Sequence, residues 1–348
     1  MKKALLLLIL LSFAGISAFA QDTVVAKGAD DQKAEKLYNE GITLFDNQNY
    51  SDALAKFNDA ITLKPQFEKA YYNRGVVQYE MKNYSAAITD FDKDIDMNPS
   101  NEKAFFSRGQ AKYALGNKTG AIEDYKEAIT LNPSYPQAYY YRGGIYFENA
   151  EYQKAIDDFT KAINYKSDYA YAYNDRGSAK KMLEDYKGAK EDYEKATELN
   201  PKLAFAFNNL GSVKKKLKDY KGALEDYTAA IKVDPDFYLA FNNRGSVKFE
   251  MEDYAGAIED YNQAIKLKFD YAYAFNNRGN AEYKQKDYKG AVADYDQAIK
   301  LDVNYGYAYL NRGIAKEMLR DAKGACEDWK KAATLGVSNA ITYSKNCK

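Results

Sequence analysis

Small, aromatic and polar residues recur along this chain every 34 residues, without one insertion or deletion. When the recurring glycine is numbered as repeat position 8, the array runs from Ala34 to Asn339 and holds nine repeats. Position 20 is alanine and position 24 is aromatic in all nine, and position 4 is aromatic in eight. A fixed period of this length predicts one supersecondary unit per repeat, stacked on its neighbours.

Each repeat has the marks of two helices joined by a turn. Asp or Asn at position 16 suits the N-cap of a second helix, and proline at position 32 ends that helix in five repeats. The small residues at positions 8 and 20 let two helix backbones approach closely. One hairpin cannot bury its own apolar face, so neighbouring hairpins must stack. We therefore expect an all-α fold.

These marks resemble tetratricopeptide repeats, and the resemblance covers Ala34 to Asn339. It implies a right-handed α-solenoid, or superhelix, of nine helix-turn-helix hairpins with a concave groove lined by the first helices. The chain departs from the family at position 7, where leucine is usual and arginine prevails here. An aspartate follows each of these arginines at position 23, so we expect ion pairs such as Arg244 with Asp260. The sixth repeat has Leu210 instead, which leaves the partner of Asp226 open.

The chain begins with the pattern of a cleavable leader. Lys2 and Lys3 precede an apolar stretch, and Ala18-Phe19-Ala20 forms a small-x-small cleavage site. We expect a signal peptide over 1–20, a flexible lead-in over 21–33, the repeat domain over 34–339 and a C-terminal tail or cap over 340–348. An uncleaved anchor is the alternative, disfavoured because the apolar stretch is short for a membrane span. The mature protein is expected to be periplasmic or extracellular, without a membrane span.

The only cysteines are Cys326 and Cys347. In an oxidising compartment such a pair usually forms a disulfide, which would tie the tail over the last repeat. A reactive thiol is the alternative.

The amino-acid composition argues against several kinds of partner and site. The 50 basic residues equal the 50 acidic ones, which argues against nucleic acid as a partner. There is no histidine, and two cysteines are too few for a thiolate metal cage. No phosphate loop or nucleophile motif occurs. We therefore expect no enzyme activity, no metal and no cofactor.

Asparagine marks the expected groove in the later repeats. An amide offers both donor and acceptor, so a row of amides can pair with the backbone of an extended peptide without reading its sequence. The row is similar to the asparagine ladder in the superhelix of O-linked N-acetylglucosamine transferase. The alternative is an internal ladder of amides bonded to one another or to neighbouring helices. The residues are Asn174, Asn208, Asn209, Asn242, Asn243, Asn276, Asn277 and Asn311.

Tyrosines and lysines complete the candidate groove. Lys181, Lys215 and Lys216 would attract an acidic segment, although a charge run is also a common solvated surface. The tyrosines of the first four repeats could stack on sugar rings or could pack between helices. They are Tyr38, Tyr72, Tyr79, Tyr113 and Tyr140.

The sequence thus favours a non-catalytic scaffold for protein–protein interaction, which binds an extended peptide or partner protein in the concave groove. The alternative is a solenoid that binds glycans or cell-envelope polysaccharide through the tyrosine-rich N-terminal half.

Overall fold

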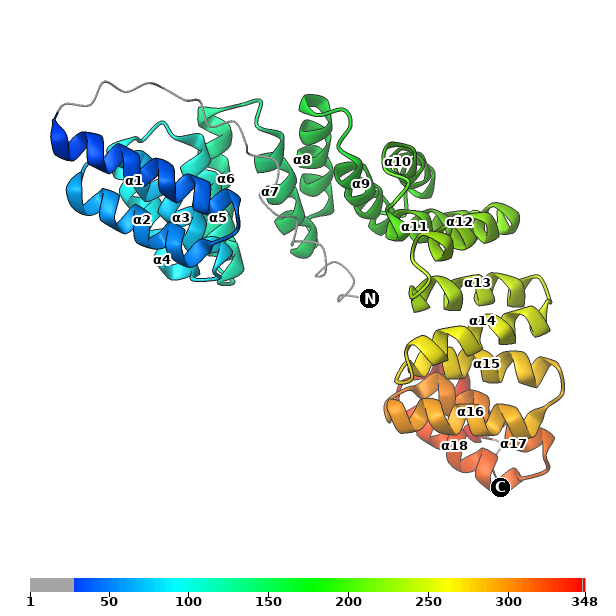
Figure 1. Ribbon diagram of the computed structural model, residues 1–348. Coiled ribbons are helices and arrows are strands. Elements are labelled where there is room, and N and C mark those ends of the chain that lie inside the picture. The colour runs from blue at the N-terminus through cyan, green and yellow to red at the C-terminus, as the bar shows by residue number, and fades with distance from the viewer. Residues whose placement is uncertain (1–27, 346, 348) are drawn as a thin grey trace. The chain divides into compact units, whose positions relative to one another are not determined.

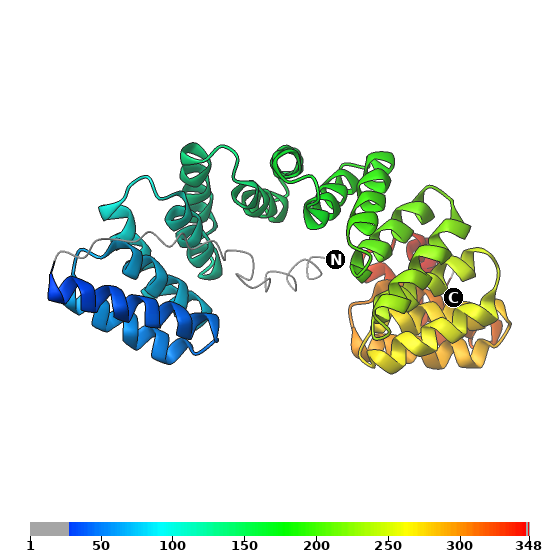
Figure 2. The ribbon, with the colours of Figure 1, turned by 45° about the horizontal axis from the view of Figure 1, so that its top comes forward.

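The computed structural model describes residues 28–345 and 347. The predicted signal peptide and most of the predicted lead-in lie outside this range. Every regular element of the described residues is a helix, and consecutive helices form hairpins (Figures 1 and 2). The predicted all-α stack of hairpins is confirmed. The chain divides into two compact units, with the boundary between Leu131 and Asn132.

The first unit holds three hairpins in its described part, and the second helices of the first two hairpins pack against the first helix of the hairpin that follows. The helices are α1 (Ala29–Asp46), α2 (Tyr50–Leu63), α3 (Glu68–Glu80), α4 (Tyr84–Met97), α5 (Glu102–Ala114) and α6 (Lys118–Leu131). Helix α1 begins inside the predicted lead-in, before Ala34. Asp30 and Asp31 lie in its first turn, where negative charge favours a helix.

The second unit holds six hairpins and a final short helix in its described part, coloured from green to red in Figure 1. Its helices are α7 (Pro136–Glu148), α8 (Tyr152–Tyr165), α9 (Ala170–Met182), α10 (Tyr186–Leu199), α11 (Ala204–Lys216), α12 (Tyr220–Val233), α13 (Tyr238–Glu250), α14 (Tyr254–Leu267), α15 (Ala272–Lys284), α16 (Tyr288–Leu301), α17 (Gly306–Met318), α18 (Ala322–Thr334) and α19 (Ser338–Lys345).

The turn inside each hairpin depends on position 15, which has a positive φ in every repeat. Only the third repeat places a glycine there, Gly116, and the others accept a left-handed conformation in a non-glycine residue. The N-caps predicted at position 16 are confirmed in some repeats and not in others. Asp185 accepts a bond from the Gly188 amide at 2.9 Å, whereas Asn49 and Asn83 occupy the N-cap position without a side-chain cap bond.

The small residues at position 8 make room for the aromatic ring at position 24. A Cβ added to Gly245 would lie 2.8 Å from the Tyr261 ring and 3.1 Å from the carbonyl oxygen of Ala257. Ala257 and Tyr261 are themselves buried. Glycine is therefore needed here for close approach rather than for an unusual backbone conformation.

The arginines of position 7 form the predicted pairs with the aspartates of position 23. Arg244 donates to both carboxylate oxygens of Asp260, at 2.9 and 2.6 Å. Its remaining nitrogen donates to Thr228 of the preceding repeat at 3.1 Å, so the same side chain also joins two hairpins. In the sixth repeat the ammonium of Lys214 lies 2.8 Å from Asp226, which supplies the partner that Leu210 cannot.

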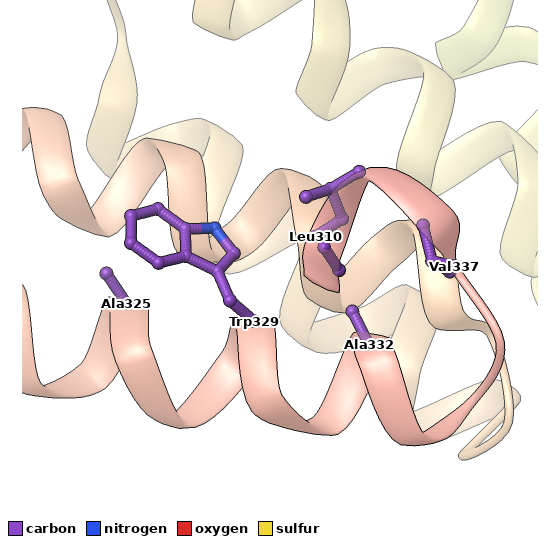
Figure 3. Close-up of a cluster of buried hydrophobic side chains, with 6 residues drawn as sticks. Leu310, Ala325, Trp329, Ala332 and Val337 are labelled. Atoms are coloured by element: carbon purple, nitrogen blue, oxygen red, sulfur yellow. The ribbon is translucent and has the colours of Figure 1, made fainter. Parts of the chain in front are cut away.

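The last hairpin is closed by α19, which packs against α18. Leu310, Ala325, Trp329, Ala332 and Val337 form a buried cluster beneath it (Figure 3). The Trp329 and Tyr343 rings lie 5.0 Å apart. A terminal hairpin has no further neighbour to cover its apolar side, and α19 covers it instead.

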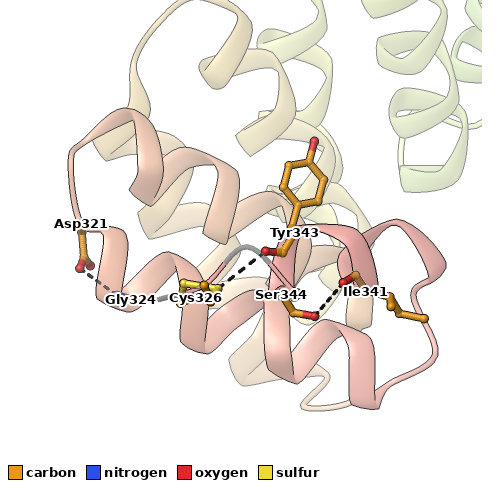
Figure 4. Close-up of a disulfide and its surroundings, with 7 residues drawn as sticks. Asp321, Gly324, Cys326, Ile341, Tyr343 and Ser344 are labelled. Carbon is orange, nitrogen blue, oxygen red and sulfur yellow. Dashed lines mark hydrogen bonds between the residues drawn. A yellow bond between two sulfur atoms is a disulfide. The ribbon is translucent and has the colours of Figure 1, made fainter.

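The predicted disulfide is present between Cys326 and Cys347 (Figure 4). It closes a sequence separation of 21 residues, and its sulfur atoms join α18 to the chain beyond α19. The bond therefore holds the cap on the last hairpin.

Reduction of this disulfide should loosen the cap. The loop-entropy relation gives about 3 kcal/mol for a loop of this size, and the loss should be greatest in α18 and α19. Amide hydrogen exchange with and without reductant measures it, and Cys347→Ser provides a control that reductant should not affect. Equal protection of α19 in the reduced and oxidised proteins would contradict the expectation.

Candidate functional site

A row of hydrogen bonds joins the first helices of the second unit. Each bond runs from the amide nitrogen of a position-6 asparagine to the amide oxygen of the position-5 asparagine one repeat earlier. The donor–acceptor pairs and distances are Asn209 to Asn174 at 3.0 Å, Asn243 to Asn208 at 2.9 Å, Asn277 to Asn242 at 3.0 Å and Asn311 to Asn276 at 3.0 Å. We call these eight residues the amide ladder. The ladder is internal, so the amides do bond to one another.

Other residue types make the same rung in earlier repeats. In the first unit Asn73 donates to the Tyr38 hydroxyl at 2.9 Å, and Tyr72 shares a hydrogen bond of 3.4 Å with Ser107. In the second unit the Tyr140 hydroxyl donates to Asp175 at 2.7 Å. Either tyrosine or asparagine at position 5 can therefore join adjacent first helices through a side-chain hydrogen bond.

The two members of a rung differ in what they can offer a ligand. Asn174, Asn242 and Asn276 are buried, whereas Asn208 and the four position-6 residues are partly exposed. An amide has two N–H groups and two acceptor lone pairs. The rung uses one N–H of the position-6 side chain, which keeps a second N–H and acceptor capacity on its carbonyl. The Asn243 carbonyl also accepts a bond from Asn242 at 3.5 Å. The position-6 amides that remain partly accessible are those of Asn209, Asn243, Asn277 and Asn311, and Asn208 at position 5 is partly exposed as well.

The tyrosines predicted for the groove are mostly packing residues. The rings of Tyr38, Tyr72 and Tyr140 each lie 5.8 Å from a buried phenylalanine of the same repeat. Burial raises the pKa of both Tyr38 and Tyr72 to about 12. The Tyr79 ring packs edge-on against Tyr84 at 5.3 Å.

Tyr113 is also half-buried. Exposed aromatic rings occur instead on the C-terminal repeats, where Tyr273 and Tyr307 are 54% and 60% exposed. The sequence did not single them out, because their repeat position is polar in several other hairpins.

A pocket of about 460 Å³ opens beside the amide ladder, lined by residues of α11, α12 and α13. The predicted residues Lys215, Lys216 and Asn243 line it together. The ammonium of Lys215 donates to the Ser246 hydroxyl at 2.5 Å. Further lining groups are the side chains of Ser212, Lys218, Tyr227 and Glu250. The structure thus brings part of the amide row and part of the lysine cluster to one place.

The pocket lysines carry an unbalanced positive charge. Burial lowers the pKa of Lys215, which Glu250 counteracts and Lys216 reinforces. Burial also lowers the pKa of Lys181, with a further contribution from the charge of Lys216. The charge of Lys216 therefore acts on both Lys215 and Lys181, although Lys181 is not among the pocket-lining residues. Adjacent lysines at position 11 differ, because Lys180 pairs with Asp192 at 2.8 Å.

Tyr227 is a pocket residue that the sequence did not single out, because position 24 looked like a packing position alone. Its ring is buried in the hairpin, yet its hydroxyl bonds to Ser212 at position 9. The same pairing recurs between Tyr193 and Ser178 at 3.0 Å. The change from phenylalanine to tyrosine at position 24 is the signal that could have indicated it.

Other kinds of site have no support in the part of the chain that the structure describes. It contains no group of three or more acidic or cysteine side chains placed to hold a metal ion. None of the described helices is both long and apolar enough to cross a membrane.

Known sequence families match most of the chain between residues 41 and 305. The family described as TPR repeat matches residues 41–82, 109–150 and 245–286. Two families described as tetratricopeptide repeat match residues 204–237 and 272–305, and residues 68–101, 136–169 and 170–203. A search of curated protein sequences found no significant match.

Solved structures are similar in fold. One is the Cut9–Hcn1 hetero-tetramer of the APC/C, with a TM-score of 0.57 and 14% identity over 95% of this chain and 78% of that chain. Another is PilF of Pseudomonas aeruginosa, with a TM-score of 0.54 and 21% identity over 61% of this chain and 97% of that chain. The family matches span more than half of the sequence, and the hairpins have the register that the family requires. The chain belongs to the tetratricopeptide repeat family.

Proposed function

We propose that this protein is a non-catalytic scaffold that binds an extended segment of a partner protein along the first helices of its second unit. Tetratricopeptide repeats generally serve in protein–protein interaction, and the observation that carries the proposal here is the amide ladder. Its position-6 amides repeat once per hairpin and keep a donor and an acceptor beyond those used in the rung. An extended peptide offers backbone N–H and C=O groups at regular intervals, which such a row can satisfy.

We further propose that the scaffold works outside the cytoplasm. The leader pattern of residues 1–20 supports export, and so does the disulfide of Cys326 with Cys347, since such bonds persist in oxidising compartments. Signal cleavage is tested by N-terminal sequencing of the protein purified from its own cell envelope. A mature chain that starts at Met1 would refute export through a cleaved leader.

The peptide test changes the accessible amides and spares the buried ones. Asn209, Asn243 and Asn277 are replaced together by serine, the residue that makes this rung naturally at Ser107. Each replacement removes the amide groups available to the peptide, and each lost hydrogen bond should reduce the binding free energy by about 1 kcal/mol. We expect binding to an array of immobilised, unstructured dodecapeptides to weaken at least tenfold. The three lost rung bonds should cost about 1 kcal/mol each, so circular dichroism must show that the variant is still folded at the temperature of the binding measurement.

Asn304→Ser is the matched control, because Asn304 is exposed in the loop before α17 and lies outside the ladder. It should bind the peptides as the unchanged protein does. Undiminished binding by the triple variant would refute peptide capture by the ladder. Binding that is lost only when the exposed rings of Tyr273 and Tyr307 are removed would favour an aromatic-anchored ligand.

A further inference from the structure

Three lysines of the second unit differ from the lysines around them. At position 11, Lys180, Lys214 and Lys248 each lie within 2.9 Å of a position-23 aspartate and serve the hairpin core. Lys181, Lys215 and Lys216 occupy the next two positions, and no ion pair to a carboxylate joins them among the described residues. Repeat position therefore separates the lysines that pair with an aspartate from those that do not. We call the unpaired ones, Lys181, Lys215 and Lys216, the groove lysines.

The groove lysines are held together in spite of their charge. Lys181 comes from α9, and Lys215 and Lys216 come from the end of α11. Two of them are partly buried, and the charge of Lys216 acts on both of the others. Like charges in a half-buried place destabilise a protein unless a counter-charge reaches them. An anionic group bound here would relieve that repulsion.

The surroundings supply further donors for such a group. Ser212, Ser246 and Tyr227 bring hydroxyls to the same pocket, and Asn243 brings an amide. Glu250, an exposed residue at the end of α13, is the only carboxylate among the pocket-lining residues. Its charge favours the protonated form of Lys215, so a carboxylate is a compatible neighbour for this ammonium.

We propose that the pocket at Lys215 is a subsite for the carboxylate side chain of an acidic peptide. Lys215 and Lys216 hold the carboxylate there, Lys181 adds its charge nearby, and the amide ladder holds the peptide backbone. The inference rests on the proposed function and adds a charge requirement to it. Asn243 connects the two parts, because it belongs both to the ladder and to the pocket lining. A peptide backbone paired with Asn243 would place a neighbouring Asp or Glu side chain over Lys215 and Ser246.

The test compares two fluorescein-labelled dodecapeptides that differ at their centre, Asp-Glu in one and Asn-Gln in the other. Fluorescence anisotropy with the disulfide-intact protein should give at least tenfold tighter binding of the acidic peptide at low salt. The difference should shrink as ionic strength rises, because the groove is partly open to solvent. Replacement of Lys181, Lys215 and Lys216 together by glutamine should remove the preference and leave the weaker binding of the amide peptide.

Two further variants keep the test specific. Replacement of Lys187, Lys221 and Lys289 by glutamine makes the same change in net charge on exposed sites of the second helices, and the preference should survive. Glu250→Gln removes the competing carboxylate and should tighten binding of the acidic peptide severalfold.

The outcomes separate the two proposals. Equal binding of both peptides would overturn the acidic subsite and leave the peptide scaffold standing. Absence of binding to either peptide would overturn both. A phosphoserine peptide that binds more tightly than the Asp-Glu peptide would overturn the assignment of a carboxylate as the anion.

Discussion

Replacement of Arg278 by alanine should cost the second unit about 4 kcal/mol at pH 8, because removal of one partner from a buried ion pair leaves the other charge unpaired. Arg278 donates to both oxygens of Asp294, at 2.7 and 2.6 Å, and Asp294 is 5% exposed. Position 11, which is lysine in five other repeats, is Glu282 here. Among the described residues, Arg278 is thus the only cation paired with Asp294, and its charge also acts on Glu282.

Arg244→Ala is the matched comparison. Its aspartate, Asp260, keeps the ammonium of Lys248 at 2.9 Å, so the loss should be roughly half as large. The sequence pattern predicted an ion pair in both repeats, and the residue at position 11 makes the two pairs unequal in strength. Equilibrium unfolding measures the total loss, and hydrogen exchange of α15 and α16 locates it, because repeat arrays unfold in parts.

The loss in Arg278→Ala should also depend on pH. Burial raises the pKa of Glu282 to about 7, and the charge of Asp294 raises it further, while Arg278 lowers it. Without the arginine, the carboxyl group of Glu282 should hold its proton more tightly in the folded state than in the unfolded chain. A carboxyl pKa raised by folding costs stability as pH rises through it. The free energy of unfolding of the variant should therefore be closer to that of the unchanged protein at pH 5 than at pH 8. Equal losses of stability at both pH values would refute this account.

Replacement of Asp94 by alanine should stabilise the first unit by up to about 4 kcal/mol at pH 8. Asp94 is fully buried, and one of its oxygens has no hydrogen-bond partner. Its other oxygen accepts a bond from Asn101 at 2.7 Å. Every other repeat has a fully buried alanine at this position. These are Ala60, Ala128, Ala162, Ala196, Ala230, Ala264, Ala298 and Ala332.

The stabilisation should follow the ionisation of Asp94. Burial raises its pKa to about 7, from about 4 in an unfolded chain. The folded protein therefore loses stability as pH rises from about 4 to about 7, and the penalty is fully present above that range. Thermal unfolding should show a gap between Asp94→Ala and the unchanged protein that is large at pH 8 and small at pH 5.

Two controls separate charge from packing. Asp94→Asn keeps the size and removes the charge, so it should retain most of the gain in stability at pH 8. Ala128→Asp places a carboxyl at the same repeat position of the next hairpin and should acquire the pH dependence that Asp94→Ala loses. A destabilised Asp94→Ala at pH 8 would contradict the unpaired-charge account.

Several structural features could be predicted from one sequence because they repeat nine times. The spacing of glycine, alanine and aromatic residues indicated the hairpins, and the recurrence of Arg with Asp sixteen residues later indicated the ion pairs. The first repeat has the opposite charges, Glu40 at position 7 and Lys56 at position 23, and these two side chains also pair, at 2.6 Å. Such inferences need only the period and the direction of the helices.

The candidate site was less predictable. The row of asparagines could be seen in the sequence, but its two alternatives, ligand contact and an internal ladder, depend on which neighbour each amide reaches. The fold buries Asn174, Asn242 and Asn276 at position 5 and leaves the position-6 asparagines of the ladder partly exposed, so one row of asparagines has two different environments. The tyrosines of the first repeats were predicted as groove residues from their repeat positions alone. In the structure the rings of Tyr38 and Tyr72 pack against the hairpin interior instead.

The sequence by itself determined the hairpin period, the register of the two helices and the disulfide partners, because each follows from residue identity and spacing along one chain. Only the tertiary structure decided which polar groups meet across hairpins. It placed Lys214 beside Asp226, left an oxygen of Asp94 unpaired and brought Lys215 to Ser246. Those contacts depend on side-chain direction and on the approach of neighbouring helices, which a one-dimensional repeat pattern does not contain.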